Sequence, residues 1–257
     1  MAATSGDLLR EWRQRRHLSQ LDLAVEAGVS SRHLSFIETG RSNPSCEMIL
    51  RLAEFLDIPL RDRNKVLLAG GYAPAYPERD LADPSLAAIR QALKAVLAGH
   101  EPYPALVVSR WWELLDANAA IAHFTADVAP HLLKPPVNAL RLSLHPDGMA
   151  SRIANLAEWR GHILTRLRRQ AQATGDARLA ELHDELASYP GGASHQTTAD
   201  VVIPLRYTVG DTELSFISIT SVLGTPMDIT VEELAIEAFY PADPRTAAFL
   251  TSRQPAQ

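Results

Sequence analysis

Apolar residues in the first seventy positions fall into five short runs. Leu8, Leu9 and Trp12 recur at helical spacing in the first run, and Leu34 and Ile37 do so in the third. This spacing is typical of amphipathic helices that bury one face. Serine, glycine and proline stand where such helices would begin and end. The predicted N-caps are Ser19, Ser30 or Ser31, and Ser45; the predicted stops are Gly28 and Gly40; and Pro59 is predicted to open the fifth helix.

Proline and glycine mark the end of this helical part. Only Pro44 and Pro59 of the 17 prolines lie in residues 1–70. The stretch Gly70–Pro77 then carries two glycines and two prolines, which cannot continue a helix. We therefore predict a helical domain over 1–70, a linker over 71–84 and a second domain over 85–257.

The second part alternates amphipathic helices with β-type segments. A helix over 84–99 suits a link between domains or pairing with its copy in a dimer, and Asn118 is predicted to cap a short helix. A long helix from Met149 to about Ala173 carries Trp159 on its apolar face and Arg166 among the arginines of the other face. A shorter helix is predicted over 176–187, and strands over 105–108, 113–115, 201–205, 214–223 and 234–240.

This order of elements predicts an α+β domain with an antiparallel sheet and helices over one face. Gly210-Asp211 marks a hairpin, and Pro204 places its strand at an edge or a bulge. This order of elements is that of a PAS-like domain. Such an arrangement leaves a cavity between sheet and helices that can hold a small apolar molecule.

The net charge of −5, with a pI near 6.0, argues against a nucleic-acid binder when the chain is taken whole. The charges are unevenly divided, however. Residues 1–70 hold ten Lys and Arg against nine Asp and Glu, a net of +1, which leaves 15 against 21, a net of −6, in the remainder. The acidity therefore belongs to the second part, and the first part is free to contact DNA.

Several other classes of protein lack support in the sequence. A single cysteine, Cys46, rules out a disulfide framework and a multi-cysteine metal site. The start carries no secretory signal and no window is apolar enough to span a membrane, so we expect a cytoplasmic protein without a membrane partner. No HExxH, GxSxG or Walker motif is present, and we expect neither an enzyme nor a bound cofactor. A metal sensor using His123, His131 and His145 stays open as an alternative.

Two short helices joined by a glycine-containing turn are typical of a helix-turn-helix, whose second helix enters the major groove of DNA. An all-α protein-interaction module has the same spacing. The residues decide between them: 18–30 (LSQLDLAVEAGVS) and 34–41 (LSFIETGR) closely resemble the XRE family of DNA-binding domains. The resemblance covers all five helices. It implies an all-α, five-helix lambda-repressor-like fold that binds double-stranded DNA.

The resemblance also assigns roles to residues. It places base contacts at Ser31, Arg32 and Phe36, and an ion pair between Arg13 and Glu38. Arg32 can form a bidentate pair with guanine, and an exposed Phe36 can pack on a thymine methyl, although burial in the helix is an equal alternative. The resemblance assigns contacts with the DNA backbone to Gln20 and to the loop of Arg41, Ser42 and Asn43, although Gln20 could instead orient the helix that enters the groove. One module makes few base contacts, so we expect a homodimer on a palindromic operator.

A second resemblance covers the remainder of the chain. Residues 100–108 (HEPYPALVV), 144–148 (LHPDG), 155–160 (NLAEWR) and 234–243 (LAIEAFYPAD) resemble the ligand-binding domain of MmyB-like transcription regulators. The resemblance implies a PAS-like sensor for a fatty acid or similar apolar metabolite that controls the DNA-binding module.

Aromatic side chains that converge from helices and sheet would line the pocket of such a sensor, although each could instead be plain core. His145 and Asn155 could hold a polar headgroup. The candidate ligand-binding residues are Trp111, Trp112, Phe124, His145, Asn155, Trp159, Phe216 and Phe239. We therefore expect a ligand-controlled transcription regulator, acting as a repressor. As an alternative, the second domain serves only dimerisation or a protein partner.

Overall fold

The computed structural model describes residues 3–192 and 202–252, and the chain divides into two compact units. Unit 1 contains the chain up to Asp80, together with Gln172–Thr174 and Thr225–Glu232. Unit 2 contains Leu81–Ala171, Gly175–Gly224 and the chain from Glu233 onward. Each unit has its own hydrophobic core.

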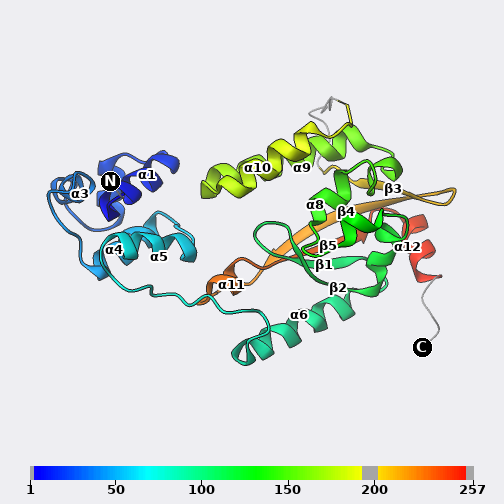
Figure 1. The fold of residues 1–257 in the computed structure, drawn as a ribbon, viewed down its shortest axis with the longest axis horizontal. Helices are drawn as coiled ribbons and strands as arrows, with labels where there is room; N and C mark the ends of the chain where they lie inside the picture. The colour runs from blue at the N-terminus through cyan, green and yellow to red at the C-terminus, as the bar shows by residue number, and fades with distance from the viewer. Residues whose placement is uncertain (1–2, 193–201, 253–257) are drawn as a thin grey trace. The chain divides into compact units, whose positions relative to one another are not determined.

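Unit 1 contains the five predicted helices, drawn from blue to cyan in Figure 1. Their apolar stripes meet in one core in which Leu9, Leu34, Leu52 and Leu67 are fully buried. Burying one face in this way supplies most of the stability of short helices, which are marginal alone. The helices are α1 Ser5–Arg15, α2 Gln20–Glu26, α3 Ser31–Glu38, α4 Cys46–Phe55 and α5 Leu60–Ala69.

The helix ends follow the predicted chemistry with one shift. The Ser19, Ser30 and Ser45 hydroxyls each accept a backbone N–H of the first turn, so these N-caps are confirmed. Pro59 stands one residue earlier than predicted, at the N-cap position, and has no side chain to cap α5. The carboxylate of Glu232, in the short helix α11 (Ile229–Glu232), accepts the N–H of Leu60 at 2.9 Å instead.

Unit 2 is an α+β domain built on a five-stranded antiparallel sheet, as expected. Its strand order is β2-β1-β5-β4-β3. Sequence neighbours β3 and β4 are joined by the two-residue turn Gly210-Asp211, where Gly210 has φ +57°. The strands are β1 Ala105–Val108, β2 Leu114–Ala117, β3 Leu205–Val209, β4 Thr212–Val222 and β5 Ala235–Pro241.

The position of β3 corrects the predicted strand over 201–205. The strand begins at Leu205, after Pro204, and Val201 lies outside the described residues. The turn fixes the register by pairing Val209 with Thr212 and Leu205 with Phe216. Proline has no N–H to donate to the ladder, so Pro204 precedes the strand rather than lying in it.

Alternate residues of the strands pack on opposite faces, as the pleat requires. Leu106 and Val108 of β1 face the larger core of unit 2, whereas Ala105 and Val107 belong to a smaller cluster. That smaller cluster includes Leu93 and Leu97 of α6 (Ala87–Gly99). Helices therefore cover both faces of the sheet, α6 on one and α8 to α10 on the other (Figure 1). The expectation of helices over one face only is wrong, because the apolar side of the helix predicted over 84–99 packs on the second face of the sheet. Its predicted role in linking domains or pairing with its copy stays a prediction.

The long helix α9 is Leu156–Thr174 and starts seven residues later than predicted. Residues 150–152 form a separate 3-10 turn. The side chain of Asn155 then bonds the backbone of Pro204 and Arg206, which fixes the point where the helix begins. Asn118 likewise makes no side-chain cap and instead bonds the backbone of Leu97, Tyr103 and Ala105. The other helices are α7 Ala122–Thr125, α8 Ala139–Leu144, α10 Ala177–Ser188 and α12 Pro244–Thr251.

Among the described residues, no helix combines the length and the apolar character that crossing a membrane requires.

Candidate nucleic-acid interface and ligand pocket

The helices α2 and α3 and the turn between them have the geometry of a helix-turn-helix. Gly28, at φ +65°, takes the left-handed conformation that ends α2, and Ser30 caps α3 two residues later. The inner face of α3 buries Leu34 and Ile37 against the core. This burial leaves the other face of α3 to present its polar side chains outward.

Three of the predicted DNA contacts gather on and beside α3. Arg32 is exposed, and its guanidinium lies 5.3 Å from the ring centre of Phe36. Arg41 is also exposed, with its guanidinium 6.0 Å from the same ring. Phe36 itself is half-buried between these two cations. The arrangement places two arginines around one aromatic ring, where cation–π attraction orders them.

The remaining predicted contacts have different environments. The side chain of Gln20 donates to the Glu38 carboxylate at 2.8 Å, so it joins α2 to α3 within unit 1. Ser31 and Ser42 are half-buried, and Asn43 is exposed. Their roles toward DNA stay predictions.

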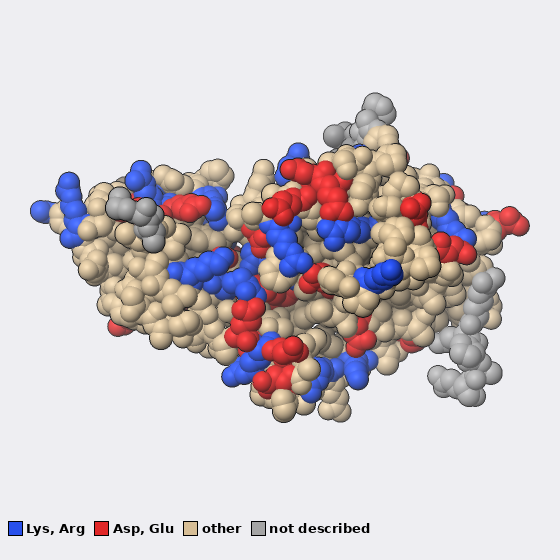
Figure 2. Space-filling model, in the orientation of Figure 1, with Lys and Arg blue, Asp and Glu red and all other residues tan. Residues whose placement is uncertain are grey.

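Residues 1–70 have a net charge of only +1. On the face drawn in Figure 2, the region labelled α1 to α5 in Figure 1 carries separate blue patches rather than one continuous basic field. Electrostatic attraction to phosphates grows with the number of cations that reach them. Arg32 and Arg41 are the two exposed cations on and beside α3, and their contact with phosphate or bases stays a prediction.

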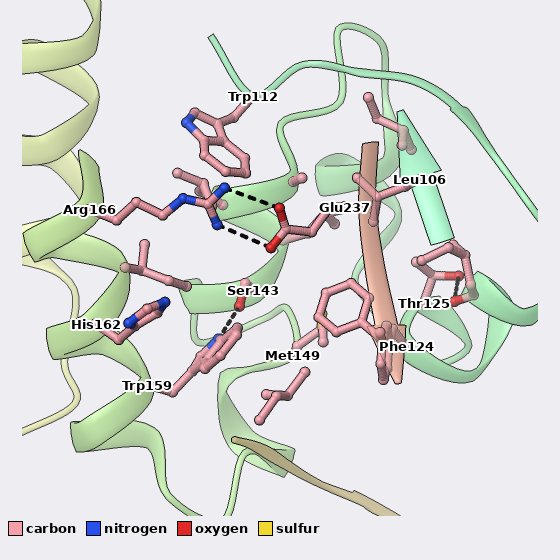
Figure 3. A pocket seen from close by; sticks show the side chains of 18 residues that line it. Leu106, Trp112, Phe124, Thr125, Ser143, Met149, Trp159, His162, Arg166 and Glu237 are labelled. Carbon is pink, nitrogen blue, oxygen red and sulfur yellow. Dashed lines mark hydrogen bonds and ion pairs between the residues drawn. The ribbon is translucent and has the colours of Figure 1, made fainter. Parts of the chain in front are cut away.

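Unit 2 holds an apolar pocket between α8, α9 and the sheet (Figure 3). Its cavity volume is about 80 Å³, on a scale where one water molecule needs roughly 10–15 Å³. The space therefore accommodates several methylene-sized groups. The lining residues are Leu106, Trp112, Leu114, Ile121, Phe124, Thr125, Ala139, Leu140, Leu142, Ser143, Met149, Trp159, His162, Ile163, Arg166, Leu205, Glu237 and Phe239.

Four of the eight predicted ligand residues line this pocket: Trp112, Phe124, Trp159 and Phe239. Trp112 has φ +65°, a strained conformation for a bulky residue. Its backbone is held by bonds to Ser109 and Ala139, and its indole N–H donates to Gln170 at 2.9 Å. The fold thus fixes this ring at the pocket wall despite the strain.

The other four lie outside the lining. The indole of Trp111 donates to Asp176, and Asn155 bonds the backbone beside β3. Phe216 is fully buried with its ring centre 5.3 Å from that of Phe124, so it belongs to the core. His145 lies beside Tyr189, with ring centres 5.1 Å apart.

Sequence reasoning missed the polar residues of the pocket. Arg166 was expected on the outer face of the long helix, but it is seven residues after Trp159 and therefore lies two turns along the same face. Its guanidinium forms a two-pronged ion pair with Glu237 of β5, with nitrogen–oxygen distances of 3.0 and 3.1 Å. The seven-residue spacing was the available signal for Arg166; no local signal marks Glu237.

The electrostatics of this pair and of the neighbouring histidine are set by burial and by each other. Burial raises the pKa of Glu237, but its bonds to Arg166, Ser218 and Thr220 outweigh this and leave the pKa below its ordinary value. The pKa of His162 is lowered by burial and by the charge of Arg166. At neutral pH the carboxylate is therefore ionised and the imidazole is neutral.

One group of side chains has the donor types of a metal site. Ligand atoms of His131, His145 and Asp147 lie within 4.8 Å of one another, and two of the three residues are exposed. His123, the third histidine of the predicted alternative, contacts Phe249 instead. His145 Nδ1 accepts the N–H of Asp147 at 3.0 Å, whereas a metal-bound imidazole donates its second N–H. We therefore assign no metal to this group.

Two family models match separate parts of the chain. Residues 89–252, more than half of the chain, match the family model described as the MmyB-like transcription regulator ligand binding domain. Residues 9–62 match the model described as helix-turn-helix.

Individual relatives and solved structures align mainly with part of the chain. The uncharacterized HTH-type transcriptional regulator RghRB of Bacillus subtilis is 33% identical over 112 residues, which cover 42% of this chain and 78% of the relative. The HTH-type transcriptional regulator DdrOP3 of Deinococcus deserti is 38% identical over 105 residues, covering 37% and 81%. The solved restriction-modification controller protein C.AhdI of Aeromonas hydrophila is 39% identical, with a TM-score of 0.22, covering 23% of this chain and 89% of its own.

Proposed function

The chain belongs to the MmyB-like transcription regulators, and from this premise we propose that it binds operator DNA as a homodimer and changes its DNA affinity when a small apolar molecule occupies the pocket of unit 2. The pocket carries this proposal, because it combines an apolar lining with a few fixed polar groups. The ligand class includes fatty acids and their uncharged derivatives. DNA binding implies that the protein works in the cytoplasm.

The DNA side of the proposal rests on α3. Arg32, in the first turn of this helix, has the reach and the exposure for a bidentate pair with guanine. Arg41, in the following loop, would contact phosphate and set the register. One module reads few base pairs, so two copies on a palindrome supply the required affinity and specificity.

The ligand side needs a connection between the pocket and unit 1, and the chain supplies one. The segment Thr225–Glu232 follows β4 and precedes β5 in sequence, yet it belongs to unit 1. Within unit 1, Asp228 pairs with Arg79 at 2.9 Å, and Glu232 caps α5. Glu237, which lines the pocket, follows Glu232 by five residues. A ligand that binds two arrangements of β5 unequally would shift the population of unit 1 through this segment.

We propose repression as the outcome of DNA binding. A dimer that covers its operator excludes other proteins from that DNA without needing a further contact. Ligand binding would then release or strengthen repression according to which arrangement the ligand prefers.

The test uses the full-length protein and DNA selected by it from a random double-stranded library. DNA affinity is measured by fluorescence anisotropy with and without 1-decanol as the apolar probe. Enrichment of a palindrome and a probe-dependent change in affinity are expected. Trp159→Ala should abolish the response to the probe and leave basal DNA binding intact.

The matched control is Trp111→Ala, which removes an indole of unit 2 that does not line the pocket. Circular dichroism establishes that both variants fold. A folded Trp159→Ala protein with an undiminished response would place the ligand elsewhere. Failure to enrich any DNA sequence would contradict the DNA-binding role.

A further inference from the structure

The charged groups of the pocket are already matched with each other. Of the eighteen lining residues, which all belong to the described part of the chain, only Arg166 and Glu237 carry a full charge. Figure 3 shows the two side chains pointing toward each other and joined by dashed lines. The lining thus contributes one positive and one negative charge, and the two lie in contact.

The bonding capacity of this pair is largely used within the protein. Glu237 accepts from both terminal nitrogens of Arg166, from Ser218 at 2.6 Å and from Thr220 at 2.7 Å. Its side chain is only 7% exposed, so water does little to screen it. The Arg166 guanidinium also lies 4.4 Å from the ring centre of Trp112, which covers one of its faces. Arg166 is therefore held in place as the partner of Glu237 rather than presented as an anion receptor.

The polar groups left for a ligand are uncharged. His162 stacks on Trp159, with ring centres 5.6 Å apart, and is neutral at neutral pH. The Ser143 hydroxyl accepts the indole N–H of Trp159 at 3.0 Å and keeps its own proton to donate. A hydroxyl, ester or amide group of a ligand can bond to these groups without bringing a charge.

We infer that the pocket selects an uncharged amphiphile, such as a fatty alcohol or a fatty-acid ester, over the anion of a fatty acid. The inference rests on the proposed function, because it assigns the ligand class of the same pocket.

The physical reason is the balance of charge. A carboxylate that approaches Arg166 also approaches the buried carboxylate of Glu237, and like charges that share a site disfavour ionisation of both. Removing a ligand anion from water is costly unless a free cation replaces the lost hydration. The only cation of the lining is already neutralised by Glu237. An ester or alcohol with the same chain therefore loses far less hydration free energy than the anion when it enters the pocket.

Three probes with the same ten-carbon chain test the inference: decanoate, methyl decanoate and 1-decanol. Their dissociation constants for the full-length protein are measured at neutral pH by the change in tryptophan fluorescence, since Trp112 and Trp159 line the pocket. We expect the two uncharged probes to bind at least about tenfold tighter than decanoate.

Replacing the charge of Glu237 tests whether charge balance causes the preference for uncharged probes. Glu237→Gln keeps the size of the side chain but replaces one accepting oxygen with an NH2 group, which cannot accept from Arg166, and it leaves the charge of Arg166 unbalanced. The ratio of decanoate to 1-decanol affinity should then shift toward decanoate by about tenfold or more. The matched control is Glu213→Gln, which removes the same charge from an exposed pair with Arg206 outside the lining. This control should leave the ratio unchanged.

The outcomes separate the inference from the proposed function. Decanoate binding as tightly as 1-decanol to the natural sequence would overturn the inference and leave the apolar pocket standing. No binding of any of the three probes would overturn the pocket itself. If Glu237→Gln fails to fold, the order of the three affinities in the natural sequence decides alone.

Discussion

Arg13 of α1 and Glu38 of α3 form a buried, two-pronged ion pair, with Nε–Oε1 at 2.7 Å and Nη2–Oε2 at 2.8 Å. Arg13 also donates to the carbonyl of Leu18, and Gln20 of α2 donates to the same Glu38 carboxylate. The hydrogen bonds to Glu38 raise the pKa of Arg13, so its charge is secure. One carboxylate therefore ties α3 to both α1 and α2, which fixes the orientation of α3 within unit 1.

Replacing Glu38 with alanine should destabilise unit 1. Arg13, only 10% exposed, would remain as a buried charge without a partner, and breaking a buried pair in this way costs about 3–5 kcal/mol. Hydrogen exchange of the α1 to α3 peptides in the full-length protein measures this destabilisation. Glu11→Ala breaks an exposed pair with Arg15 and should cost less than about 1 kcal/mol. Similar effects of the two variants would contradict the structural role of the buried pair.

Arg32 and Arg41 should differ in how their replacement affects DNA binding. Arg32→Ala removes about 1–3 kcal/mol of discrimination and should relax specificity at one position of each half-site. Arg41→Ala should weaken binding to all sequences alike and reduce the salt slope by about 0.9 for each phosphate that is no longer neutralised. Binding-site selection and anisotropy at several salt concentrations give both readouts. An unchanged base preference in Arg32→Ala would remove its assigned role.

Glu232→Ala should uncouple the ligand from DNA. The variant leaves the N–H of Leu60 without its cap, which costs about 0.5–2 kcal/mol at the start of α5. The affinity for 1-decanol should stay the same, while the ratio of DNA affinities with and without the probe moves toward one. Glu54→Ala, an exposed position on α4, is the control. An undiminished ratio in Glu232→Ala would show that the signal does not pass through this cap.

The acid sensitivity of unit 2 should include a contribution from His162. Burial, followed by the charge of Arg166, lowers the pKa of His162 below the ordinary histidine value of 6.5. As the pH falls, His162 therefore binds its proton in the unfolded chain before it does so in the folded protein. The contribution of neutral His162 to the free energy of unfolding is complete above the unfolded pKa and is lost as the pH falls toward the folded pKa.

NMR titration of the histidines in the full-length protein tests this prediction. His162→Gln identifies the His162 resonance. The variant should also make the free energy of unfolding less dependent on pH below about pH 6.5. His183→Gln, on α10 beside the exposed Asp184, is the control. A pKa for His162 at or above the ordinary histidine value would contradict the burial of its ring against Trp159.

Local patterns are sufficient for most of the fold because they reflect short-range physics. The spacing of Leu34 and Ile37 and the cap at Ser30 lie within one helix, and the structure has both as predicted. The hairpin at Gly210-Asp211 is equally local. The strand predicted over 201–205 lies too early in the chain. The apolar residues there favour a strand in the sequence, but the register that the turn imposes places β3 at Leu205–Val209.

The five-helix module, the α+β class of unit 2 and the family of the chain can all be inferred from the amino-acid sequence, since each rests on patterns contained in contiguous segments. The chemistry of the pocket depends instead on tertiary packing. An arginine on a helix and a glutamate on a strand each predict a solvated surface, because burying either charge alone is costly. Arg166 and Glu237 lie 71 positions apart, and it is the packing of α9 on β5 that brings them together and makes their burial possible.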